Sequence, residues 1–172
     1  MWRHGLCLLL LLSLPAQGAA QSCDLSFTVE VTQGVGTILP GTRLEGQASF
    51  TATGRSFRQE GGSTTHLAEG EMRLGSTIRG EIWTLITTSR GPTADLVGIH
   101  ARDVQGLSFG GLAYNGPMMV TLFGRPGARP DTAIPVRQAD WDRMDLRRAF
   151  SLHAHGVDML AGVVSDLVAR CN

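Results

Sequence analysis

The sequence predicts an all-β protein, in which a single antiparallel meander of about eight strands forms a closed or nearly closed barrel. Apolar and polar residues alternate along several segments, and short stretches rich in Gly, Pro and Asn separate those segments. Alternation with a period of two is typical of strands that have one buried and one solvated face. Cys23 and Cys171 lie near the two ends of the expected mature chain, which favours a barrel whose first and last strands meet. A β-sandwich is the alternative fold.

The first two predicted strands, 24–32 and 42–53, show the alternation most clearly. In the first strand, Leu25 and Phe27 belong to the apolar phase, and Asp, Ser, Thr and Glu residues form the other phase. In the second strand, Phe50 lies in the apolar phase, and the opposite phase holds Arg, Glu, Gln and Ser residues. Turn-forming Gly and Pro residues separate the two segments. We expect the apolar phase of each strand to face the core.

Three more strands are predicted over 65–74, 77–88 and 95–109, after a polar, Gly/Ser-rich loop at 54–64. The first two strands keep the alternation, and glycines within the third indicate bends or bulges. The residues expected on the inward faces are Ala68, Met72, Leu74, Ile78, Ile82 and Ile86.

The segment 117–123 is apolar in both phases, which is typical of a strand covered on both sides. The Gly/Pro-rich segment 124–145 comes next and is expected to supply the second cover. Trp83 shares its phase with Arg79 and Glu81, so it is an aromatic side chain on an otherwise polar face. We expect the segment 124–145 to lie over Trp83 as well.

One short helical turn is predicted near 138–144, where Trp141 and Met144 are spaced i, i+3 and supply its apolar contacts. Two final strands follow, over 146–154 and 158–169. They complete the set of eight strands, and hairpin-length connections between neighbours favour the meander.

Closure of an even-numbered meander places the first and last strands side by side. Cys23 shares its phase with the inward residues of the first strand, and Cys171 shares its phase with Met159, Val163 and Leu167. We therefore expect both cysteines to face inward and to form a disulfide, which stabilises by about 4–5 kcal/mol in the chain-entropy model. The apolar residues then expected to face outward are Leu160, Val164 and Val168.

Residues 1–20 have the features of a secretory signal peptide: Arg3, an apolar stretch, and small residues that lead to cleavage near Ala20. The apolar stretch is too short for a membrane-spanning helix, so none is expected in the mature chain. Residues 21–172 then form a single barrel-like domain in the periplasm or outside the cell. An oxidising compartment of this kind favours the predicted disulfide.

The composition indicates the kind of genome that encodes the chain and argues against one class of partner. The chain contains no lysine and is rich in Arg, Ala and Gly, which we interpret as the mark of a GC-rich bacterial genome. Residues 21–172 keep 14 arginines against 15 acidic residues, a formal charge of −1. This balance argues against a nucleic-acid partner.

Two histidines, His153 and His155, are spaced to point the same way from a strand and are weak candidates for metal ligands. They share their phase with Arg147 and Ser151, so ordinary surface histidines are the alternative. No further ligand is evident, and we expect no metal or other cofactor.

We expect a non-catalytic binding module for a small apolar or amphipathic ligand, because small eight-stranded barrels can hold one ligand in their interior. No nucleophile, phosphate-binding or dinucleotide motif is present, and no catalytic residue is assigned. The alternative is an envelope structural or protein-interaction domain with a filled core. The candidate ligand-binding residues are His66, Phe50, Met72 and Ile82, together with Arg55 and Arg58 in the loop at 54–64.

Overall fold

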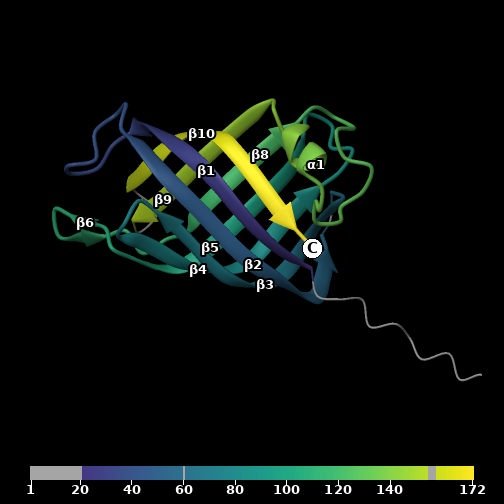
Figure 1. The fold of residues 1–172 in the computed structure, drawn as a ribbon, viewed down its shortest axis with the longest axis horizontal. Coiled ribbons are helices and arrows are strands. Elements are labelled where there is room, and N and C mark those ends of the chain that lie inside the picture. Colours follow the sequence, from purple (N-terminus) through teal and green to yellow (C-terminus); the bar gives the residue numbers. More distant parts are fainter. Residues whose placement is uncertain (1–20, 60, 155–157) are drawn as a thin grey trace, which may run out of the picture.

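A computed structural model of the chain, described for residues 21–59, 61–154 and 158–172, shows a closed antiparallel barrel of eight strands (Figure 1). The predicted barrel is confirmed, and the sandwich alternative is wrong. The order around the barrel is β1-β10-β9-β8-β5-β4-β3-β2. The bounds are β1 (Ser22–Gln33), β2 (Arg43–Arg58), β3 (Ser63–Leu74), β4 (Ile78–Thr88), β5 (Asp95–Gln105), β8 (Met118–Gly124), β9 (Arg147–Ala154) and β10 (Asp158–Cys171).

Three short elements lie outside the barrel wall. The strands β6 (Ser108–Phe109) and β7 (Leu112–Ala113) form a separate hairpin, so the predicted strand 95–109 ends earlier than expected. The predicted helical turn is present as α1 (Gln138–Asp142). The expected signal peptide lies outside the described residues. Among the described residues, no helix has both the length and the apolar character needed to cross a membrane.

The barrel closes between β1 and β10, and the disulfide lies at the end of this seam. Cys23 and Cys171 are paired residues of the two strands and form the predicted disulfide. Next to them, the Asn172 amide donates to the Ser22 carbonyl at 3.0 Å, and the Ser22 amide donates to Asn172 Oδ1 at 3.1 Å. The first and last described residues therefore lie at one end of the barrel, as expected.

The interior is filled by the inward side chains of all eight strands. The Phe27 ring lies directly against the backbone of Gly46 on β2, where an added Cβ would come within 2.1 Å of a ring carbon. Gly70 allows a similarly close approach, because a Cβ there would lie 2.0 Å from the Ser49 carbonyl oxygen. The completely buried interior residues include Val29, Ala48, Met72, Ile82, Leu85, Val97, Ile99, Met118, Val120, Leu122, Leu152 and Leu160.

Two β-bulges change which residues face inward. In β4 the register with β5 shifts between Ile82 and Thr84, so Leu85 is completely buried and Ile86 is only half-buried. The expected inward position of Ile86 is therefore wrong, because one extra residue in a strand moves all later side chains to the other face.

The second bulge lies in β10, where Asp166 and Leu167 together lie opposite Phe27 of β1. Asp166 has a φ of 51°. On the N-terminal side of Asp166, the inward and outward positions of β10 are exchanged relative to those counted from Cys171. Leu160 and Val164 consequently face inward, which corrects the expectation that they face outward. Met159 and Val163 occupy the outward phase instead, whereas Val168 is outward, as predicted.

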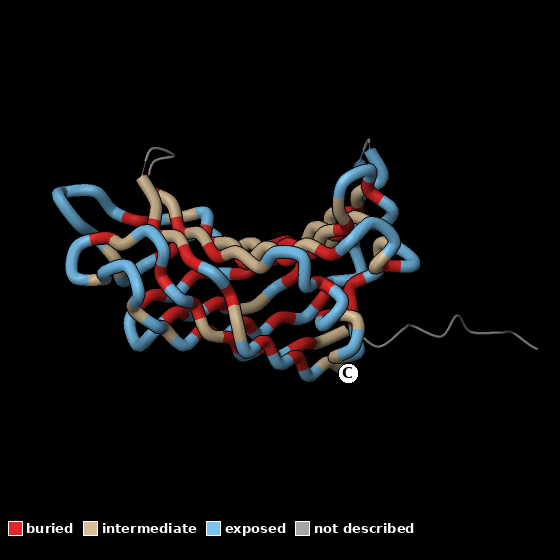
Figure 2. The backbone as a smooth tube through the Cα atoms, turned by 90° about the horizontal axis from the view of Figure 1, so that it is seen from above, coloured by how far each residue is buried: buried red, intermediate tan, exposed pale blue. Residues whose placement is uncertain are grey.

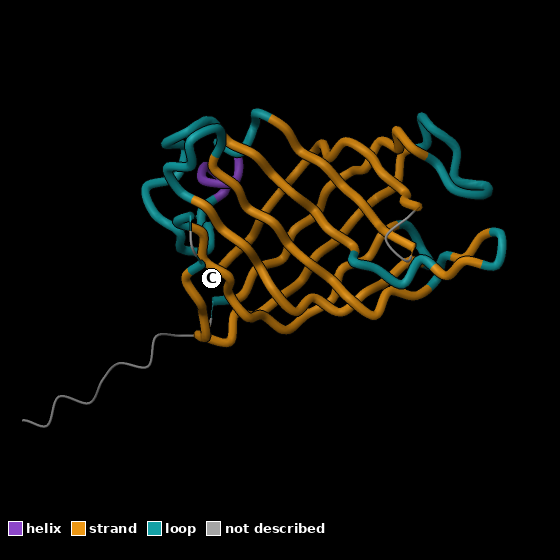
Figure 3. Tube along the Cα trace, turned by 180° about the vertical axis from the view of Figure 1, so that it is seen from behind, coloured by secondary structure: helices purple, strands orange, loops and turns teal. Residues whose placement is uncertain are grey.

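Residues 125–146, here called the cap segment, close the end of the barrel at which the disulfide lies (Figure 3). Trp141 and Met144 are completely buried and belong to the core, as predicted. Gln138 anchors the segment to β10, because its Oε1 accepts from the Ala169 amide at 2.6 Å and its Nε2 donates to the Leu167 carbonyl at 3.1 Å. The opposite end is filled by Tyr114, which is 1% exposed.

The cap segment packs into the end of the barrel, and the outward residues of β8 are half-buried rather than fully covered, contrary to the expectation from the apolar sequence of β8. Trp83, also expected to be covered, is 42% exposed and contacts the Arg102 guanidinium on one face. The outward residues of β8 and its neighbour β9 are mostly uncharged and half-buried, in contrast to the charged outer positions on β1, β2 and β3. Buried and exposed residues alternate along the strands of the barrel (Figure 2). The uncharged set consists of Met119, Thr121, Phe123, Ala149, Ser151 and His153.

Candidate functional site

The loops at the capped end of the barrel form two adjoining grooves. One, here called the rim groove, has a volume of about 400 Å³ and lies between the β2–β3 hairpin, the β4–β5 loop and the cap segment. The other, here called the cap groove, has a volume of about 280 Å³ and lies within the cap segment. Pro130 and Asp131 line both grooves, so the two adjoin each other at these residues.

A hydrogen-bond network around Thr132 fixes the cap segment to the barrel beneath the rim groove. His66 Nε2 lies 2.8 Å from the Thr132 carbonyl oxygen and 3.1 Å from Thr87 Oγ1. Because a carbonyl oxygen only accepts, His66 carries its proton on Nε2. The Thr87 hydroxyl donates to the same carbonyl, and Thr64 Oγ1 lies 2.8 Å from Thr132 Oγ1. His66 thus positions the wall of the groove through bonds to protein atoms.

Two guanidinium groups give the rim groove its charge. Arg58, at the end of β2, and Arg90, in the β4–β5 loop, both line it, together with Ser63, Ser89 and Thr132. Arg90 has a φ of 57°, which is uncommon for a residue other than glycine. Such backbone strain is often found where a side chain is held for function. With Asp131 as the acidic residue of the lining, the groove has an excess of positive charge.

A buried carboxylate connects the β4–β5 loop to the cap segment. Asp95 is fully buried, and its two oxygens accept from the backbone amides of Gly91 at 3.1 Å and Arg129 at 2.8 Å. Ser89 Oγ donates to the Arg129 carbonyl at 2.9 Å. These bonds hold Arg129 where its side chain forms part of the cap groove.

The other sequence-predicted ligand residues are distributed between the interior and the surface. Phe50, Met72 and Ile82 are 3%, 0% and 0% exposed, and they pack against other interior side chains. Arg55 is exposed on the β2–β3 hairpin and does not belong to the lining of the rim groove. Of the six candidates, Arg58 therefore lines a groove and His66 supports one.

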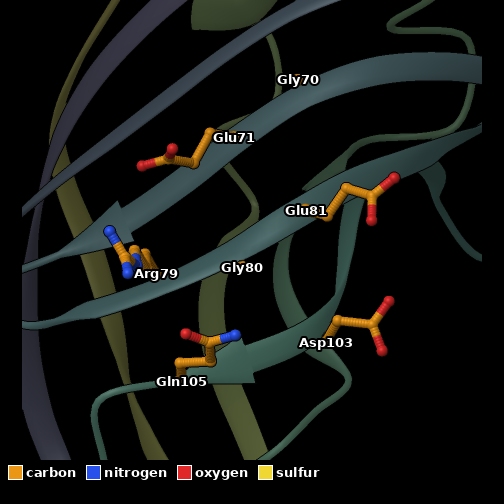
Figure 4. A pocket seen from close by; sticks show the side chains of 7 residues that line it. All are labelled: Gly70, Glu71, Arg79, Gly80, Glu81, Asp103 and Gln105. Carbon is orange, nitrogen blue, oxygen red and sulfur yellow. The ribbon is translucent and has the colours of Figure 1, made fainter.

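A third groove, of about 360 Å³, lies on the charged outer face between β3, β4 and β5 (Figure 4). Its carboxylates belong to Glu71, Glu81 and Asp103, and Glu71 points away from the other two. Glu71 is paired with Arg73, which lowers the pKa of that carboxyl group. The acidic residues therefore do not converge on one point.

The predicted histidine pair is only partly described. His153 is half-buried in the outward phase of β9, opposite Met159, and His155 lies outside the described residues. Within the described ranges, no group of three or more His, Cys, Asp or Glu side chains is arranged to hold a metal ion.

Sequence patterns did not identify Arg90, Arg129 or Thr132. All three lie in loops, where no periodicity indicates which way a side chain points. The signal that does exist is compositional: Arg125-Pro126 and Arg129-Pro130 place cations in a Pro-rich segment next to the core residue Trp141. No family model matches this chain, and neither the curated proteins nor the solved structures include a match to it.

Proposed function

We propose that the protein is a non-catalytic binding module, in which a filled barrel is the scaffold and the capped end binds a small ligand that carries an anionic group. The observation that carries this proposal is the rim groove, which is lined by Arg58 at the end of β2 and by Arg90 in the β4–β5 loop. Guanidinium groups with neighbouring hydroxyls recognise carboxylate and phosphate oxygens through charge-assisted hydrogen bonds.

The packing of the barrel supports a site at the end rather than in the interior. Met72 and Ile82 have no exposed surface, and the Phe27 ring occupies the space beside Gly46. A ligand in the interior would have to displace these side chains, whereas loops on a rigid scaffold are common positions for binding residues. The alternative of an envelope interaction domain also uses a filled core and stays a prediction.

The test is calorimetric titration of the protein, residues 21–172, with inorganic phosphate and with citrate. We expect saturable binding of at least one of these anions, weakened about tenfold in Arg58→Ala and in Arg90→Ala, which corresponds to roughly 1.4 kcal/mol. Arg55→Ala is the matched control, because Arg55 lies on the same hairpin outside the groove. Absence of binding by the parent protein, or an equal loss in Arg55→Ala, would overturn the proposal.

We also propose that the chain is exported and acts outside the cytoplasm. The disulfide supports this location, because structural disulfides persist in oxidising compartments. Mass spectrometry of protein from the cell envelope or medium of a bacterial host is expected to show a chain that begins near Gln21. The same sample should gain two hydrogens on reduction. An unprocessed chain with free thiols in the cytoplasm would contradict this assignment.

A further inference from the structure

Arg129 is a buried cation, whereas the arginines that form ion pairs in this protein are exposed. Arg129 is 4% exposed as a residue. The side chains of the ion-paired arginines are 53–72% exposed; these are Arg43, Arg73, Arg102, Arg137 and Arg143. Within the described residues, no carboxylate lies within ion-pair distance of the Arg129 guanidinium. Its Nη2 donates to the Ala133 carbonyl, and its Nε has no partner among the described residues.

The neighbouring carboxylates use their oxygens elsewhere. Asp95 accepts from two backbone amides, and Asp131 Oδ1 accepts from the Ala133 amide at 3.0 Å. Asp140 is held by Arg137 through two bonds of 3.0 Å. Burial lowers the pKa of the Arg129 guanidinium, although Asp131, Asp140 and Asp95 act in the opposite direction. A buried charge with an unused donor is costly unless an anion compensates it.

The cap groove combines this cation with apolar walls. Arg129 lines the groove together with Ala128, Ile134, Pro135 and Val136, of which Val136 is 46% exposed. The lining also contains the charged residues Asp131, Arg137 and Asp140. The volume of about 280 Å³ is slightly below the range of roughly 300–1,000 Å³ that is usual for drug-sized ligands. The groove therefore suits a small molecule with one anionic group and a short apolar stem.

We propose that the cap groove binds an alkyl carboxylate, with its carboxylate on the Arg129 guanidinium and its chain against Ile134 and Val136. The inference rests on the proposal that the capped end is the binding surface, but it uses a different groove and a different arginine. A carboxylate accepts from a guanidinium through two parallel hydrogen bonds, and the Arg129 side chain would turn its buried, unpartnered Nε toward the groove to form both. The flat guanidinium group of Arg129 can form these two parallel bonds to a carboxylate, whereas a lysine ammonium group cannot.

The first experiment is calorimetric titration with sodium octanoate, octanol and octylamine at neutral pH. We expect octanoate to bind with a stoichiometry of one, and octanol and octylamine to bind at least tenfold more weakly. Equal affinity for octanol and octanoate would overturn the role assigned to Arg129. Absence of saturable octanoate binding below its micelle concentration would overturn the site itself.

Variants separate binding from folding. Arg129→Gln removes the charge, and Val136→Asp places a carboxylate at an exposed position of the lining, where no core contact is lost. Each is expected to weaken octanoate binding at least tenfold. Arg125→Gln, in the same segment but outside the lining of the groove, is the matched control and should retain the parent affinity. If Arg129→Gln fails to fold, Val136→Asp decides: unchanged octanoate affinity in that variant would overturn the proposal.

The same titrations distinguish this inference from the proposed function. Arg58→Ala and Arg90→Ala are expected to lose anion binding at the rim groove and to retain octanoate binding. Retained octanoate binding in a protein that binds neither phosphate nor citrate would contradict the rim-groove function and support the cap-groove assignment. Binding of phosphate or citrate without binding of octanoate would overturn the cap-groove assignment alone.

Discussion

The Phe27 ring and the Gly46 backbone are packed face to face across β1 and β2, in paired positions of the two strands. A Cβ added to Gly46 would lie within 2.1–2.6 Å of three ring carbons, far inside van der Waals contact. Phe27 is 4% exposed and surrounded by other interior residues, so its ring has little room to move aside. The absence of a side chain at residue 46 therefore determines where the aromatic ring sits.

Gly46→Ala is expected to destabilise the protein by about 1–3 kcal/mol, the usual cost of overpacking a filled core. Urea denaturation followed by tryptophan fluorescence measures the change. Gln47→Ala, at the exposed neighbouring position, is the control and should change stability by less than about 0.5 kcal/mol.

A double variant tests the packing argument directly. In a protein that already carries Phe27→Leu, we expect Gly46→Ala to lower the free energy of unfolding by less than it does in the parent. A purely additive result would contradict the packing argument.

Replacement of both cysteines, Cys23→Ala with Cys171→Ala, is expected to lower the free energy of unfolding by roughly 2–5 kcal/mol. The disulfide closes almost the whole described chain, with a sequence separation of 148, so its effect on the unfolded state is large. The β1–β10 ladder remains, so the circular dichroism spectrum should stay that of a β protein. An unchanged denaturation midpoint would contradict the expectation.

Tyr114 is the single tyrosine of the chain, and its environment raises the pKa of the phenol to about 12. Burial is the main cause, and the hydrogen bond from its hydroxyl to Asp158 Oδ2 adds to it. The unfolded value is about 10. The folded state thus holds the proton more tightly, so this contribution to stability is present below pH 10 and is lost as the pH rises toward 12.

The absorbance of ionised tyrosine near 295 nm follows this one group directly. We expect a titration midpoint near 12 in the parent protein. Asp158→Asn removes the negative charge and is expected to shift the midpoint toward the ordinary value. Tyr114→Phe should remove the alkaline loss of stability. A midpoint near 10 in folded parent protein would show that the phenol is solvated.

Gln138→Ala is expected to destabilise the cap segment by about 1–3 kcal/mol, because it leaves the Ala169 amide and the Leu167 carbonyl without their side-chain partner. Hydrogen exchange at the Ala169 amide should become faster, while exchange in β4 should change little. Gln138→Glu keeps the acceptor for the Ala169 amide but places a carboxylate against Asp142 and the Leu167 carbonyl, so it is expected to destabilise the segment as well. Equal exchange rates in parent and variant would contradict the anchoring role.

Periodicity in the sequence was sufficient for the inward phases of β1, β2 and β3, and the two terminal cysteines together with the short connections were needed to predict the closed barrel. Periodicity failed beyond the bulge in β4 and on the N-terminal side of the bulge in β10. Asp166 adopts a positive φ and shifts β10 by one residue, so the phase counted from Cys171 was wrong at Leu160 and Val164. Nothing in the composition of Ser165-Asp166-Leu167 indicates this, because the extra residue is accommodated by pairing with β1.

The candidate site was less predictable than the fold. Arg58 was identified because it lies in a polar loop, but the grooves depend on contacts between segments far apart in the sequence, such as Thr64 with Thr132 and Asp95 with Arg129. The apolar character of 117–123 suggested a covering segment, yet the cap segment packs into the end of the barrel. Tertiary packing of loops carries no local periodicity, so this arrangement required the structure.

The hydrogen bonds between Ser22 and Asn172 make the protein a suitable scaffold for circular permutation. A short glycine linker would join these two residues without disturbing any strand pairing. New ends at the tight turn between Leu74 and Ile78 would then lie at the other end of the barrel. In such a rearranged polypeptide, fluorescent labels or surface attachments would lie away from the rim groove and the cap groove.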